Sequence, residues 1–135
     1  MSATKLVVNV DGGARGNPGP AAVGVVVATA AGDLLAEVGE TIGPATNNVA
    51  EYKALLRGIE LAIEHDGDEV QFFGDSELIV KQVRGEYRVK DPGLKPLHAQ
   101  VKSGLASLGS WSISHVRREQ NARADALVND ALDAA

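Results

Sequence analysis

Residues 5–20 read KLVVNVDGGARGNPGP, in which a run of apolar residues leads into a glycine-rich segment. The side chains of residues 6–10 are expected to point alternately to opposite faces, which is the period-two pattern of a β-strand with one buried face. Asp11 ends this run, and residues 12–19 are predicted to form a loop because glycine and proline favour turns. Taken alone, Asp11 fits either an ordinary turn residue or a carboxylate placed at a binding site.

The rest of the chain predicts an α/β fold built from this first strand outward. Valine-rich and leucine-rich segments at 21–29 and 34–42 predict two more strands, joined as an antiparallel meander. Periodicity then predicts, in order, a helix over 48–64, a strand over 69–74, a helix over 76–83, a loop over 85–93, a helix over 94–108, a strand over 111–116 and a helix over 121–132. This order indicates a mixed five-stranded sheet flanked by helices. With 135 residues, we expect a single domain over residues 1–135.

Three further acidic residues lie in distinctive settings. Glu51 is in TNNVAEYKALLRGIELAI beside the apolar stripe of the predicted helix, and Asp125 is in the helical pattern NARADALVNDAL. Asp75 ends VQFFGD immediately before SELIVKQV. Glu51 and Asp125 also fit salt bridges at the edge of a buried face, and Asp75 also fits a helix cap. If the fold brings all four acids together, their oxygen atoms suit Mg²⁺ or Mn²⁺.

Composition and charge exclude some functions and permit others. The chain has no cysteine, which excludes disulfides and thiol chemistry. The net charge is −5, but residues 1–80 hold 4 Lys/Arg against 12 Asp/Glu, whereas residues 81–123 hold 9 against 3. Such a basic segment suits phosphate binding, although it also fits an ordinary solvated surface. The N-terminal MSATKLVV has no long apolar segment, so we expect no signal peptide, no membrane association and a cytoplasmic protein.

The four acids and their surroundings resemble type 1 ribonucleases H, which cut the RNA strand of RNA–DNA hybrids. The resemblance runs from about Leu6 to Leu132 and rests on DGGARGNPGP, TNNVAEY, GDSELIVKQV and NARADALVNDA. It points to the compact bacterial and archaeal subtype and implies a sheet with strand order 3-2-1-4-5. It also implies hydrolysis of the RNA strand with two Mg²⁺ or Mn²⁺ ions, which leaves 5′-phosphate and 3′-hydroxyl ends. We expect the protein to be a monomer.

The resemblance assigns roles to individual residues. Asp11 would bridge the two ions, Asp125 would help to hold one ion, and Glu51 with Asp75 would hold the other. Residues expected to contact the hybrid are Gly12, Gly13, Asn17, Thr46, Asn47, Ser76, Tyr87 and Arg118. Helix capping is an alternative or additional role for the TNN segment, and Tyr87 also fits a half-buried structural residue.

Two departures from the family pattern bear on the site. Many members carry a catalytic histidine in a loop after the fifth strand, but His115 is predicted to lie within that strand because the following loop is short. Arg117 or Arg118 would then do part of its work, and a catalytic-loop role of His115 itself is the alternative. The long basic insertion of larger members is reduced to about residues 85–94, and Glu77 replaces a glutamine. Rival functions are another nuclease of the same fold, such as a junction resolvase, a non-catalytic hybrid-binding module, and one half of a longer bifunctional protein.

Overall fold

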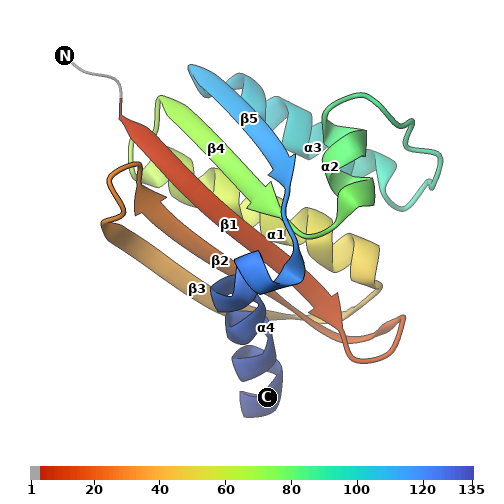
Figure 1. Ribbon diagram of the computed structural model, residues 1–135. Coiled ribbons are helices and arrows are strands. Elements are labelled where there is room, and N and C mark those ends of the chain that lie inside the picture. The colour runs from red at the N-terminus through yellow and green to blue at the C-terminus, as the bar shows by residue number, and fades with distance from the viewer. Residues whose placement is uncertain (1–3) are drawn as a thin grey trace.

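The computed structural model describes residues 4–135. Residues 1–3, on which the expectation about a signal peptide partly rests, lie outside the described residues. The elements in chain order are β1 (Lys5–Ala14), β2 (Gly19–Thr29), β3 (Leu34–Ala45), α1 (Asn47–Glu64), β4 (Glu69–Gly74), α2 (Glu77–Val83), α3 (Lys95–Ala106), β5 (Ser110–His115), the 3-10 turn η1 (Arg118–Asn121) and α4 (Ala122–Ala134). Figure 1 shows one sheet with helices on both of its faces.

The five strands form a mixed sheet in the order β3-β2-β1-β4-β5, which confirms the expected fold. The first three strands pair antiparallel, whereas β4 pairs parallel with β1 and β5 pairs parallel with β4. β1 is therefore the central strand and the only one of the described sheet with an antiparallel neighbour on one side and a parallel neighbour on the other. The parallel pairing places the carboxyl end of β4 beside Val10 of β1.

The main hydrophobic core lies between the sheet and α1, α2 and α3. The alternating side chains of β1 that the sequence pattern assigned to one face, Leu6, Val8 and Val10, are all buried there. Tyr52 and Leu55 of α1 are buried in the same core. The central strand is thus fixed in the molecule by packing on this face.

Helix α4 covers the opposite face of the sheet, across β2 and β3 (Figure 1). Val128 and Leu132 of α4 form a smaller apolar cluster with Ala22 of β2. The helix lies very close to the sheet at Gly24, where an added Cβ would come within 2.2 Å of the Ala124 carbonyl oxygen. Glycine is needed at this position because any side chain would push α4 away from β2.

Several predicted boundaries differ from the structure; β3, for example, continues to Ala45, three residues beyond its predicted end. β1 does not end at Asp11 but continues to Ala14, because β2 still pairs with residues 11–14 after β4 has ended. The predicted loop over residues 12–19 is therefore limited to residues 15–18. The predicted helix over 121–132 is preceded by η1, which the periodicity did not indicate.

Within residues 4–135, no helix is both long enough and apolar enough to cross a membrane.

Candidate active site

Asp11 and Asp75 are brought together by the parallel pairing of β1 with β4. The last pair of this ladder is Val10 with Gly74, so the two acids are the next residues on adjacent strands. Asp11 remains paired with Gly24 of β2, and its side chain is 5% exposed. Asp75 lies just beyond β4 and is half-buried. The prediction that each of these acids follows the end of a strand is confirmed for Asp75. Asp11 follows the last residue of β1 that pairs with β4, but β1 itself continues beyond Asp11.

Glu51 reaches the same place from α1 because this helix lies directly against β1. A Cβ added to Gly12 would come within 2.2 Å of the Ala50 carbonyl oxygen, so only glycine allows this approach. Asp11, Glu51 and Asp75 each offer a carboxylate oxygen, and these oxygens all lie within 4.8 Å of one another. Three carboxylates at this spacing are suited to a hard divalent cation.

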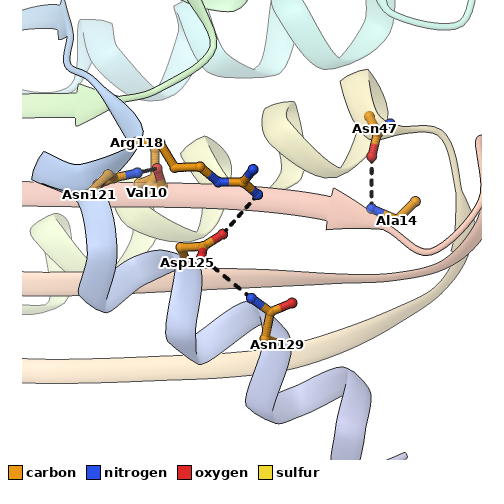
Figure 2. Close-up of polar contacts among 7 residues, drawn as sticks. All are labelled: Val10, Ala14, Asn47, Arg118, Asn121, Asp125 and Asn129. Atoms are coloured by element: carbon orange, nitrogen blue, oxygen red, sulfur yellow. Dashed lines mark hydrogen bonds and ion pairs between the residues drawn. The ribbon is translucent and has the colours of Figure 1, made fainter.

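Asp125 lies near this cluster but outside its 4.8 Å limit. It lines the same cleft, of about 450 Å³, whose walls come from β1, α1, α4 and the segments after β4 and β5. Its two oxygens have separate partners (Figure 2): Arg118 donates from Nη2 to Oδ1 at 3.3 Å, and Asn129 donates from Nδ2 to Oδ2 at 3.4 Å. The structure thus places the fourth predicted acid at the site and holds it between two donors.

The electrostatics of the cluster oppose full ionisation. Burial, together with the nearby charge of Asp75, raises the pKa of Asp11 to about 7. Burial also raises the pKa of Glu51 well above its ordinary value, with added repulsion from Asp11 and Asp75. A bound cation would remove this repulsion and favour the charged form of each carboxylate. The donor set therefore fits a divalent cation on both geometry and charge.

Arg118 is the cationic residue that faces the cluster from η1. Its hydrogen bond to Asp125 raises the pKa of the guanidinium, and the charges of Asp11 and Asp75 add to this effect. Among residues 4–135, Arg118 lines the cleft, whereas His115 and Arg117 lie outside its lining. His115 is the exposed last residue of β5, which agrees with the prediction that it lies within the strand.

Asn17 and Asn47, which are both expected to contact the hybrid, form a small polar network beside α1. The Asn47 amide donates to Oδ1 of Asn17 at 3.0 Å, and Oδ1 of Asn47 accepts from the Ala14 amide at 2.9 Å (Figure 2). Thr46 is the N-cap of α1, and its hydroxyl oxygen accepts from the Val49 amide at 3.2 Å. Helix capping is therefore a real role of Thr46, and the two asparagines fasten the 15–18 loop to α1.

The other predicted contacts lie on both sides of the acids. Gly12 and Gly13 line the cleft within β1. Ser76 is the N-cap of α2 and accepts from the Ile79 amide at 3.4 Å. Tyr87 is 48% exposed, and the Nζ of Lys81 lies 5.0 Å from the centre of its ring. A second cleft of about 610 Å³ includes Tyr87 in its lining, together with Gln82, Gly85, Glu86, Arg88, Val89, Lys95, His98 and Lys102.

Three residues of the site were not predicted from the sequence. Asn129 and Arg15 line the main cleft, and Arg15 forms an ion pair with Asp133 at 2.6 Å. Asn121 is buried beside β1 and donates from Nδ2 to the Val10 carbonyl at 2.9 Å. For Asn129 a signal existed, since it lies four residues after Asp125 on one helix. The contacts of Arg15 and Asn121 join residues more than a hundred positions apart and leave no local pattern.

A 3-2-1-4-5 mixed sheet with clustered carboxylates where β1 and β4 meet defines the ribonuclease H-like class of proteins. Residues 9–131 match the family described as reverse transcriptase-like. The chain is 48% identical over 123 residues to ribonuclease HI of Halobacterium salinarum, and the match covers 91% of this chain and 62% of that protein. The chain belongs to the type 1 ribonuclease H family.

Solved structures agree with this assignment. The crystal structure of the Halobacterium salinarum RNase H1 superposes with a TM-score of 0.95 at 46% identity, covering 97% of this chain and 99% of that one. LC11-RNase H1 in complex with an RNA/DNA hybrid gives a TM-score of 0.90 at 45% identity, covering 96% and 97%. The bifunctional protein Rv2228c of Mycobacterium tuberculosis is 44% identical over 132 residues. The chain spans 62% of the length of the halobacterial protein but 36% of Rv2228c.

Proposed function

We propose that this protein is a metal-dependent endoribonuclease that hydrolyses the RNA strand of RNA–DNA hybrids. The observation that carries the proposal is the group of Asp11, Glu51 and Asp75, whose carboxylate oxygens lie within 4.8 Å of one another in an open cleft. The 45% identical LC11-RNase H1, which was solved with an RNA/DNA hybrid, supports the substrate. Residues 1–135 would act as one catalytic domain, as a monomer, and in the cytoplasm.

The cofactor we propose is a pair of Mg²⁺ or Mn²⁺ ions. Asp11 would contribute to both sites, Glu51 and Asp75 to one, and Asp125 to the other. Ions bound at these carboxylates would stabilise the negative charge that develops on the attacking and leaving oxygens of the phosphodiester. The raised pKa values of Asp11 and Glu51 support cation binding, because these carboxylates have a strong electrostatic demand for positive charge.

The side chains of the site would hold the scissile phosphate during cleavage. A water oxygen would attack phosphorus as the bond from phosphorus to the 3′ oxygen breaks, and a proton from the water would pass to the 3′ oxygen, which leaves a 5′-phosphate and a 3′-hydroxyl. Arg118, which bonds Asp125 at 3.3 Å and faces the cluster, would offset the charge on the phosphate. His115 and Arg117, outside the cleft lining, would have at most a secondary effect on turnover.

Recognition of the hybrid would be divided between the two sides of the site. The backbone of Gly12 and Gly13 lies in the cleft, where it would approach the 2′-hydroxyl groups that distinguish RNA from DNA. Thr46 and Asn47 would bind a phosphate of the DNA strand, and Asn17, which bonds the Asn47 amide, would contact the hybrid beside them. Ser76 would contact the hybrid beside Asp75, and the exposed ring of Tyr87 would pack against a DNA sugar or base.

The proposal is tested by supplying three end-labelled duplexes: RNA–DNA hybrid, duplex RNA and duplex DNA. Each is incubated with Mg²⁺, with Mn²⁺ and with a chelator. We expect cleavage of the RNA strand of the hybrid only with a divalent ion present, and end-group analysis should give 5′-phosphates. Binding of the hybrid without cleavage under any metal condition would instead identify a non-catalytic hybrid-binding module, and cleavage of duplex DNA would indicate another nuclease of the same fold.

A further inference from the structure

Asn121 is placed at the N-cap of α4, where asparagine normally accepts a hydrogen bond from the first turn of its own helix. Among the described residues, the Asn121 side chain makes no such capping bond. It is 2% exposed, and Nδ2 donates to the Val10 carbonyl at 2.9 Å while Oδ1 accepts from Nδ2 of Asn9 at 3.0 Å. Figure 2 shows this side chain directed at β1 rather than along α4. The amide therefore joins α4 to the central strand.

Both ends of this connection lie beside an acidic residue of the site. Val10 directly precedes Asp11, and Asn9 shares a face of β1 with Asp11 because side chains alternate along a strand. Asn121 lies four residues before Asp125, which places both residues on the same face of the helix. Val10 is also the last residue of β1 that pairs with β4. The Asn121 amide thus bonds β1 at the end of its parallel pairing with β4, directly before Asp11.

The other contacts of α4 hold it to different strands. The close approach at Gly24 sets the distance of α4 from β2, and Arg123 forms a two-pronged ion pair with Glu37 of β3. Asn121 ties the start of α4 to β1 itself. Loss of this tie would leave the first turn of α4, which carries Asp125, held to β2 and β3 but no longer bonded to β1 through Asn121, while β1, β4 and α1 still hold the other three acids.

We propose that Asn121 is a positioning residue that sets the distance of Asp125 from Asp11 and so allows the two acids to hold an ion jointly. This inference rests on the metal site of the proposed function. It predicts a specific loss: cation binding at Asp125 weakens, whereas the cluster of Asp11, Glu51 and Asp75 remains.

The direct test uses Mg²⁺ alone, added to ¹⁵N-labelled protein and followed through the amide chemical shifts of Asp11 and Asp125. In the wild type, both signals should respond over the same concentration range. In Asn121→Ala, the response at Asp125 should need about tenfold more Mg²⁺ or more, as is typical when a residue supporting a metal ligand is removed. Asp125→Asn gives the reference for complete loss of this ligand.

Turnover of the hybrid provides a second readout. Asn121→Ala should lower kcat by about tenfold or more and leave KM within about twofold. The matched control is Tyr52→Phe, which removes another buried side-chain hydrogen bond, 2.6 Å long, from Tyr52 to Gln82. It should lower the melting temperature without changing the Mg²⁺ response or kcat. Should Asn121→Ala fail to fold, Asn9→Ala, which removes the partner of the Asn121 Oδ1, serves for the same comparison.

The outcomes separate this inference from the proposed function. A wild-type protein that binds Mg²⁺ but leaves the hybrid intact contradicts the proposed function, while the Mg²⁺ comparison still decides the role of Asn121. An Asn121→Ala protein with wild-type Mg²⁺ response and kcat overturns the inference and reduces Asn121 to a stabilising residue. The inference also fails if Mg²⁺ leaves the wild-type Asp125 signal unmoved.

Discussion

At the scale of single residues, the site depends on carboxylates placed where repulsion between them is strong. Asp11 is 5% exposed, with Glu51 and Asp75 near enough to share a cation. The sequence singled out four acids because each stands in a recognisable local setting, and the structure brings Asp11, Glu51 and Asp75 together. It could not predict that Asp125 would lie outside this group of three, near Asp11 and between Arg118 and Asn129, because that depends on how α4 docks.

Replacement of Asp11 or Asp75 by asparagine should abolish most activity. Asp11→Asn and Asp75→Asn each remove one negative ligand while keeping nearly the same shape. Hybrid cleavage should fall by about a hundredfold or more, because loss of a direct ligand exceeds the usual 10–100-fold effect of supporting residues. Single-turnover rates and far-UV circular dichroism measure activity and fold. Near-normal turnover in either folded variant would contradict the proposed metal site.

The stability of the metal-free protein should depend on Asp11 in a defined pH range. The pKa of Asp11 is raised from 3.8 to about 7 in the folded state, so the folded state keeps this proton longer than the unfolded state does. Stability is therefore lost as the pH rises from about 4 to about 7. Asp11→Asn should melt higher than the wild type above pH 7, and this advantage should vanish near pH 4.

Thermal melts in chelator at several pH values measure this effect. Addition of Mg²⁺ at pH 8 is the control, since it should raise the melting temperature of the wild type more than that of Asp11→Asn. An advantage of Asp11→Asn that is the same at pH 4 and pH 8 would show that carboxylate repulsion is not its cause.

Arg118 should matter more than His115. His115 lies outside the cleft lining, so His115→Ala should lower kcat by less than about tenfold, below the usual contribution of a general acid or base. Arg118→Ala should lower kcat more, because it removes a cation that faces the cluster. Rates at saturating hybrid decide between them. A loss in His115→Ala as large as that in Asp125→Asn would place the histidine in the catalytic site.

At the scale of elements, local patterns predicted nearly every helix and strand, because core packing produces the periodicity of the sequence. The errors occurred where a distant element decides the outcome. β1 continues past Asp11 because β2 pairs with it, and neither η1 nor the close approach of α4 to Gly24 has a local signature. The substrate contacts expected from the family remain predictions.

Gly24→Ala should displace α4 and weaken both stability and turnover. The added Cβ would come within 2.2 Å of the Ala124 carbonyl oxygen, one residue before Asp125. Overpacking of this kind costs about 1–3 kcal/mol, measured by urea unfolding. At Gly39 the corresponding distance to the Leu127 carbonyl oxygen is 2.8 Å, so Gly39→Ala should have a smaller effect. Equal stability of Gly24→Ala and wild type would mean that α4 adjusts freely.

At the scale of the whole molecule, acidic and basic residues are separated between the two parts of the chain. The acids of the site lie where β1 and β4 meet, whereas basic residues surround the second cleft beside Tyr87. The sequence predicted this asymmetry from the charges of residues 1–80 and 81–123. An acidic protein with net charge −5 can thus present a positive surface to a polyanion.

The double variant Arg88→Ala/Lys90→Ala should weaken hybrid binding without affecting the chemical step. Each neutralised phosphate contributes close to one unit to the slope of log affinity against log salt. The double variant should raise KM and flatten that slope by about one to two units, with little change in kcat. KM and kcat at several salt concentrations measure this. An unchanged KM and slope would show that the hybrid is held by other residues.

The end of α4 has a practical consequence for immobilising or tagging the protein. Leu132 lines the cleft and is three residues from Ala135. Lys5 begins the central strand β1, at the end of that strand that lies away from the cleft (Figure 1). A polypeptide or solid support attached after Ala135 would lie beside the cleft that the hybrid enters. Attachment through the amino-terminal side would keep that entrance clear, so it is the better tether for single-molecule or surface-based assays.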